Sequence, residues 1–90
     1  MDELRRIDLN MLVTLHALLA EKHVTRASVR LHKSQPAVSH ALGLLRAHFD
    51  DPLLIRRNGA MVLTARAQAL AQPLQDALRN LNSLLGAPTF

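Results

Sequence analysis

The sequence predicts a mostly α-helical domain in which three helices precede a two-stranded β-hairpin and a long fourth helix. Apolar residues recur at helical spacing in three early segments. An Asn58-Gly59 turn then separates two apolar runs, and a heptad pattern follows over residues 65–85. With 90 residues, the chain has room for one such domain.

The first helix is expected over residues 8–21, with Asp8 as its N-cap because an aspartate side chain can accept the free N–H groups of the first turn. Residues on one side recur at helical spacing: Leu9, Leu12, Val13, His16, Leu19 and Ala20. Leu15 and Leu18 widen this stripe. We therefore expect the helix to be covered on more than one side.

A short second helix is expected over residues 26–32, with Thr25 as its N-cap and Ala27 toward the core. Arg26 and Arg30 are four residues apart and share its outer face. That outer face is therefore predicted to be basic.

A third helix is expected over residues 35–49, because Ser34 can cap it and Pro36 falls in the first turn, where its missing N–H costs nothing. Its apolar stripe consists of Val38, Ala41, Leu42, Leu45 and Phe49. Its opposite face carries small or polar residues, namely Gln35, Ser39, His40, Gly43 and Arg46. For two turns this outer face has little bulk.

The link between the second and third helices is about two residues long, His32 and Lys33. A link this short favours a crossing near 90–120°, which is typical of a helix-turn-helix. His32 can take the positive φ that such a turn needs. The motif is expected at about residues 24–43.

A β-hairpin is predicted over residues 53–57 and 60–63, because Asn58-Gly59 suits the two positive φ angles of a type I′ turn. Arg56 and Arg57 lie near its tip. A two-stranded ribbon after the third helix makes the predicted fold a winged helix-turn-helix.

The long helix is expected over residues 65–85, with Thr64 as its N-cap, a kink or weak point at Pro73 and a stop at Gly86 and Pro88. Its heptad a and d positions are Ala67, Leu70, Leu74, Ala77, Leu81 and Leu84, broadened by Leu78 and Leu85. This seam can form a homodimer or pack on the chain's own first helix. We expect both.

Charge is concentrated in the middle of the chain. The formal net charge is +4, but residues 22–66 hold eight bases and two acids, a net charge of +6. This placement favours a polyanionic partner, although a solvated basic surface is the alternative. With no cysteine, the chain has no disulfide, thiolate metal site or cysteine nucleophile.

Other function classes have weaker support. Ser39 and His40 are adjacent on a helix and point about 100° apart, and no acid is placed to orient the histidine. The five histidines lack zinc-site spacing. Base stacking on RNA or single strands is disfavoured because Phe49 is the one aromatic of the basic region and faces the core. We also expect no signal peptide and no membrane span.

Residues 24–43, VTRASVRLHKSQPAVSHALG, with the following LLRAHFDDPLLIRRNGAMVLTARAQAL, resemble the N-terminal domain of LysR-type transcriptional regulators. The resemblance covers about residues 7–67, and the heptad helix continues it to about residue 86. Its most specific part is SQPAVS at 34–39 combined with PLLIR at 52–56. His40 stands where the family often has arginine.

The resemblance implies a winged helix-turn-helix domain at 1–64, a linker and dimerisation helix at 65–86 and a tail at 87–90. The family also has a C-terminal domain that binds a small-molecule effector, and we expect that domain to lie outside these 90 residues. The implied partners are double-stranded DNA and a second copy of the chain. The second copy would bind through a seam of Leu70, Leu74, Ala77, Leu78, Leu81 and Leu84. A tetramer is a further option for the full-length protein. No cofactor, metal or membrane is implied. The expected location is cytoplasmic and nucleoid-associated.

The expected DNA-binding residues fall into two groups. The third helix would enter the major groove, where Gln35 suits adenine, Ser34 and Ser39 suit a base edge or phosphate, and Pro36 suits a thymine methyl. His40 is either a base contact or simply exposed, and Ser34 and Pro36 can serve as caps alone. Flanking contacts to phosphate or the minor groove are expected from Thr25, Arg26, Arg30, Lys33, Arg56 and Arg57. The alternative function is a protein-interaction or oligomerisation module with an incidental basic face.

Overall fold

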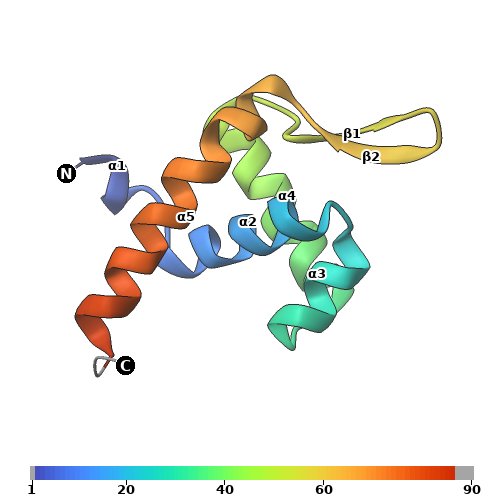
Figure 1. Ribbon diagram of the computed structural model, residues 1–90. Helices are drawn as coiled ribbons and strands as arrows, with labels where there is room; N and C mark the ends of the chain where they lie inside the picture. Colours follow the sequence, from blue (N-terminus) through green and yellow to red (C-terminus); the bar gives the residue numbers. More distant parts are fainter. Residues whose placement is uncertain (1, 87–90) are drawn as a thin grey trace.

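The structure, a computed structural model, describes residues 2–86, so the predicted tail at 87–90 lies outside the described residues. Its elements in chain order are α1 (Asp2–Arg5), α2 (Leu9–Glu21), α3 (Val24–Leu31), α4 (Gln35–Phe49), β1 (Leu54–Arg57), β2 (Ala60–Leu63) and α5 (Ala65–Leu85). This order confirms the predicted winged helix-turn-helix fold, and it adds the short α1, which the sequence analysis missed. Figure 1 shows the hairpin projecting from one end of the domain, with α5 running back across α2 toward the other end.

The helix α2 is capped as predicted, because the Asp8 carboxylate accepts the Asn10 N–H at 2.8 Å. The predicted apolar face was wrong in part: Leu15, Leu18 and Leu19 are buried as expected, but Leu9, Val13 and Ala20 are exposed. The buried side of α2 runs through Thr14, Leu15 and Leu18, whereas Val13 remains 45% exposed. Thr14 tolerates this burial because its hydroxyl donates to the Asn10 carbonyl at 3.1 Å.

The helix α3 begins two residues before its predicted start, so Thr25 lies inside the helix and is not its N-cap. His23 is the cap, and its Nδ1 accepts the Arg26 N–H at 3.2 Å. The turn between α3 and α4 is as predicted: His32 has φ 56°. After the turn, the Lys33 N–H donates to the Ser28 carbonyl at 3.0 Å, which closes the C-terminal end of α3.

The core lies where α2, α4 and the base of the hairpin meet. Leu15, Leu18, Val38, Leu45, Leu53 and Leu54 are its largest fully buried side chains. The predicted α4 stripe is confirmed at Val38, Leu42 and Leu45, while Phe49 packs against the core from its edge. Burying this face leaves the opposite side of α4 at the surface.

The hairpin has the predicted turn, since Asn58 and Gly59 have φ angles of 52° and 79°. Its register pairs Leu54 with Leu63 and Arg57 with Ala60. The first strand begins one residue later than predicted, because Leu53 has φ 62° and lies outside strand geometry. Leu53 is fully buried, and this burial holds a leucine in a conformation it seldom adopts.

The helix α5 starts at its predicted cap, where the Thr64 hydroxyl accepts the Ala67 N–H at 3.1 Å. It continues through Pro73 as one helix to Leu85 and ends at Gly86. Leu70 and Leu74, on either side of Pro73, both pack against the core and hold the helix in place there. Among residues 2–86, no helix is long and apolar enough to cross a membrane.

Candidate nucleic-acid interface

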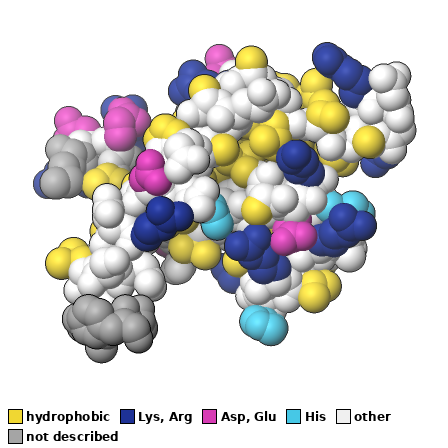
Figure 2. Space-filling model, in the orientation of Figure 1, with side chains coloured by type: hydrophobic (Ala, Val, Ile, Leu, Met, Phe, Trp, Pro, Cys, Tyr) yellow, Lys and Arg dark blue, Asp and Glu magenta, His cyan; other side chains and the backbone are white. Residues whose placement is uncertain are grey.

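The predicted DNA-binding residues are all exposed and come from three parts of the fold. They are Thr25, Arg26 and Arg30 on α3; Lys33 and Ser34 in the turn; Gln35, Pro36, Ser39 and His40 on α4; and Arg56 and Arg57 on β1. In Figure 2, Lys and Arg side chains gather around α3 and along the hairpin, and a small acidic patch lies among them. The exposed set therefore spans the α3–α4 motif and the hairpin.

The start of α4 offers a surface that DNA bases can approach. The Ser34 hydroxyl accepts the Ala37 N–H at 3.2 Å, so Ser34 does cap the helix, and its own O–H can still donate. Gln35, Pro36 and Ser39 lie exposed on the first two turns. Their side chains are short or unbranched, so a nucleic acid could approach the backbone of α4 closely.

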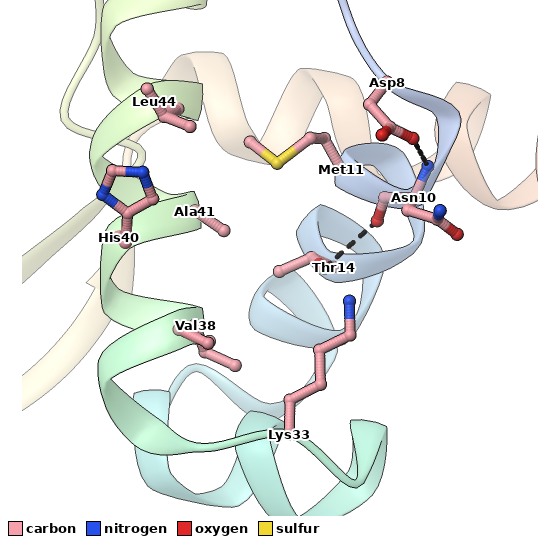
Figure 3. A pocket seen from close by; sticks show the side chains of 10 residues that line it. Asp8, Asn10, Met11, Thr14, Lys33, Val38, His40, Ala41 and Leu44 are labelled. Atoms are coloured by element: carbon pink, nitrogen blue, oxygen red, sulfur yellow. Dashed lines mark hydrogen bonds between the residues drawn. The ribbon is translucent and has the colours of Figure 1, made fainter.

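Lys33 and His40 line a cavity of about 290 Å³ between α4 and the start of α2. Figure 3 shows the Lys33 side chain extending toward Thr14 on α2, whereas His40 is directed away from α2. Both side chains are exposed, and Lys33 lies along the flank of the motif.

A second hollow, of about 420 Å³, lies between α3 and the hairpin and brings together Arg26 and Arg56. Only Arg26 and Arg56 of its lining residues were predicted as part of the site. Glu21, Lys22 and His23, at the end of α2 and the cap of α3, also line it and were not predicted. Lys22 is the C-cap of α2, with φ 54° and its backbone N–H donating to the Leu18 carbonyl. We call this hollow, lined also by residues 59–61, the wing groove.

The direction of the hairpin is fixed at its base by two polar side chains. The Asp51 carboxylate accepts the Leu53 N–H at 2.8 Å and the Thr64 hydroxyl at 2.6 Å, which ties the start of the hairpin to its end. Arg46, expected on the outer face of α4, instead donates to the carbonyls of Pro52 and Leu54 at 2.7 and 2.9 Å. Arg46 is therefore part of the hairpin's support, and its charge is directed to the protein backbone.

The hydrogen bond from Thr64 and then that from the Leu53 N–H hold the pKa of Asp51 below its ordinary value of 3.8. Arg66 adds attraction in the same direction, and partial burial opposes it. A carboxyl whose pKa is lower in the folded protein stabilises it above the unfolded pKa. That stabilisation is lost as the pH falls through the folded value.

We therefore expect Asp51→Asn to lower the melting temperature at pH 7 and to do so less as the pH falls below about 4. Thermal unfolding followed by circular dichroism from pH 7 to pH 2 measures this difference. Asp50→Asn is the matched control, because Asp50 is exposed and has φ 50°, which asparagine also adopts readily. A melting difference that stays constant over the whole pH range would contradict the assigned role of the Asp51 charge.

The predicted dimerisation seam divides between the inside and the outside of the domain. Ala67 is buried, and Leu70 and Leu74 pack against the core. Leu78 and Leu81 are half-buried, whereas Ala77 is exposed and Leu84 is 78% exposed. The first half of the seam thus belongs to the chain's own core, and the second half leaves apolar surface uncovered.

The order and spacing of these elements match a described protein family. Residues 9–68 match "Bacterial regulatory helix-turn-helix protein, lysR family", which spans α2 to the start of α5. The chain belongs to the LysR family. Within that match lie the motif α3–α4, the hairpin and every residue of the wing groove.

The chain is similar to curated proteins from rhizobia. The chain is 45% identical over 82 residues to the HTH-type transcriptional regulator SyrM of Rhizobium etli, covering 91% of this chain and 24% of that protein. It is 44% identical over 85 residues to nodulation protein D 1 of Bradyrhizobium sp. (strain NC92), covering 93% of this chain and 27% of that protein. The chain spans about a quarter of the length of these curated relatives.

Several solved structures have the same fold. A probable transcriptional regulator, PA0477 from Pseudomonas aeruginosa, superposes with a TM-score of 0.88 at 40% identity, over 100% of this chain and 31% of that one. A complex titled CbnR_DBD-DNA gives a TM-score of 0.74 at 25% identity, over 84% of this chain and 87% of that one. The BenM_DBD/catB site 1 DNA complex gives a TM-score of 0.80 at 23% identity, which shows a similar fold alone.

Within residues 2–86, no group of three or more His, Asp or Glu side chains is placed to hold a metal ion. The relatives named here are described as transcriptional regulators or nodulation proteins, not by an enzymatic activity.

Proposed function

We propose that this chain is the DNA-binding part of a bacterial LysR-type transcriptional regulator and that it binds double-stranded DNA sequence-specifically as a dimer. The observation that carries the proposal is the exposed start of α4, where Gln35, Pro36 and Ser39 present short or polar side chains. These residues lie in the matched LysR region, and cations on α3 and β1 flank them.

The helix α4 is the proposed reader of the major groove, which is wide enough for one α-helix. Gln35 would pair with an adenine through its amide, because the amide can donate and accept at the same base edge. Ser34, Ser39 and His40 would contact base edges or nearby phosphates, and Pro36 would meet a thymine methyl. The cap made by Ser34 is compatible with this role, since its hydroxyl proton is not used by the cap.

The flanking cations are the proposed phosphate contacts. Thr25, Arg26, Arg30 and Lys33 would hold the backbone beside α4, and Arg56 would reach flanking DNA from the hairpin. Arg57 is next to Arg56 on one strand, so it points to the opposite face of the hairpin and contributes less. Such contacts set position and affinity, whereas base contacts set the sequence that is preferred.

The second half of the α5 seam, together with the outer face of α2, is the proposed surface for a second copy. Leu84 on α5 and Val13 on α2 are exposed apolar residues on these two surfaces. A dimer that meets two half-sites gains affinity, because the second contact becomes intramolecular. We place this activity on the chromosomal DNA of the bacterial cytoplasm, with no cofactor or metal required.

Binding measurements on the 90-residue chain test the proposal. A preferred site is first selected from a library of random duplexes, and affinity for that site and for random duplex DNA is then measured at about 50 and 200 mM salt. A preference of at least 10³-fold for the selected site is expected. No enrichment of any sequence, with binding absent at the lower salt, would instead favour a protein-interaction module whose basic face is incidental.

Arg56→Ala is expected to weaken binding to selected and random DNA alike. It should also reduce the slope of log affinity against log salt by about one, because one phosphate contact and its released counterion are lost. Arg79→Ala, an exposed arginine on α5, is the matched control for the loss of charge. An Arg56→Ala slope equal to that of the wild type would show that Arg56 does not contact phosphate.

A further inference from the structure

The wing groove contains one acidic side chain among its cations. Lys22, Arg26 and Arg56 line it from the end of α2, the start of α3 and the hairpin. Glu21, the last residue of α2, lines it as well. A phosphate entering this space would therefore meet a carboxylate of its own sign.

Glu21 also makes a contact across the helix-turn-helix. Its Oε2 lies 3.2 Å from Nη1 of Arg30, nine residues further on, so the pair bridges α2 and α3. Both side chains are partly exposed, 32% for Glu21 and 44% for Arg30. A single hydrogen bond joins them, so Arg30 can exchange its partner without repacking the core.

A role in stability does not account for the position of this pair. Exposed ion pairs add about 0–1 kcal/mol to folding, because solvent screens them and both side chains lose freedom. Phosphate binding is more sensitive, since almost all non-specific affinity for DNA is electrostatic. Glu21 would lower the affinity for DNA in two ways: its carboxylate repels phosphate, and its ion pair with Arg30 keeps that cation from binding phosphate.

We propose that Glu21 restrains the affinity of this protein for DNA by competing with the phosphate backbone for Arg30. The inference rests on the DNA binding proposed above. Glu21 would act through its contact with Arg30, as a positioning residue. The consequence is a protein that dissociates more readily from DNA of any sequence, where electrostatic contacts alone retain it.

The test variant is Glu21→Gln, which keeps the side chain's size and removes its charge. With Arg30 released, the slope of log affinity against log salt should steepen by about one. Affinity for random duplex DNA at 0.1 M salt should rise by up to about eightfold, the value for one complete phosphate contact. Glu21→Asp, which keeps the charge, should remain close to the wild type.

A double-mutant cycle identifies the route of the effect. In an Arg30→Ala background, Glu21→Gln should change the salt slope little, because the cation that it releases is gone. Glu3→Gln is the matched control, because Glu3 on α1 forms an exposed pair with Arg6, just after that helix, at 3.6 Å and away from the wing groove. It removes the same charge and should leave affinity nearly unchanged.

Two results would overturn the inference. Unchanged affinity and salt slope in Glu21→Gln would show that the Glu21–Arg30 pair has no effect on DNA binding. Weaker DNA binding at an unchanged melting temperature would mean that Glu21 instead directs Arg30 onto phosphate. Both results are distinct from a failure of the proposed function. In that case the wild-type chain would show no binding to any duplex at 50 mM salt.

Discussion

A Val13→Asp/Leu84→Asp double variant is expected to be monomeric and to bind its selected site about 10²- to 10⁴-fold more weakly than the wild type. Affinity falls this far because a monomer loses the intramolecular second contact that linked half-sites provide. Each carboxylate would also be buried without a partner in a dimer, at a large cost in free energy. The expected loss is therefore far greater than that from any single phosphate contact.

The two positions separate the interface from the fold. Val13 is 45% exposed and Leu84 is 78% exposed, so charges there remain in water when the chain is alone. Leu74 lies on the same predicted seam but packs against the core. A charge at Leu74 would therefore disturb folding and would not report on the interface.

Sedimentation at tens of micromolar protein measures the oligomeric state, and thermal unfolding checks that the variant is folded. Val29→Asp is the control for an added charge, because Val29 is 70% exposed on α3, at the opposite end of the domain from Leu84. It should sediment like the wild type. A wild-type monomer at this concentration, or a dimeric double variant, would contradict the proposed interface.

The features that the sequence predicted well are those that short stretches determine. The Ser34 and Thr64 caps follow from a side chain that reaches an N–H three residues ahead. The hairpin turn follows from the φ preferences of Asn58 and Gly59 alone. Both need only local geometry, so no knowledge of the rest of the fold was required.

The features that could not be predicted from the sequence depend on residues that are distant in the chain. Asp51 and Thr64 are thirteen residues apart and meet only once the hairpin has closed. Arg46 is on the polar side of α4 by spacing, yet it donates to two carbonyls at the start of the hairpin, those of Pro52 and Leu54. Leu53 takes a positive φ that burial enforces and that no local preference indicates.

The candidate site shows the same division. Exposed residues of α4 were predicted because its apolar stripe fixes the outward side. Glu21 was not, since its contact with Arg30 depends on how α2 crosses α3. The apolar face of α2 was also assigned only in part, because both sides of this helix carry leucines: Leu19 is buried as expected, whereas Leu9 is exposed. Spacing alone does not say which side meets α4.

The variant Gln35→Ala is expected to cost about 1–3 kcal/mol of binding at the selected site and much less on random DNA. Gln35 opens α4 and is exposed, so its amide can donate and accept at the edge of one adenine. A phosphate contact would behave differently, because phosphates are the same in every sequence. The ratio of the two affinity losses therefore separates base reading from positioning.

Ser39→Ala provides an internal comparison on the next turn. It should follow Gln35→Ala if Ser39 contacts a base and should weaken both DNAs equally if it contacts phosphate. Neither residue lies on the buried Val38–Leu42–Leu45 side of α4, so both variants should melt at the wild-type temperature. Gln75→Ala on α5 is the control, because it also removes an exposed glutamine. Equal losses on selected and random DNA by Gln35→Ala, with melting unchanged, would refute base reading by Gln35. The base preference at one position of the selected site should also relax in Gln35→Ala, because the adenine would lose the side chain that distinguishes it from the other bases.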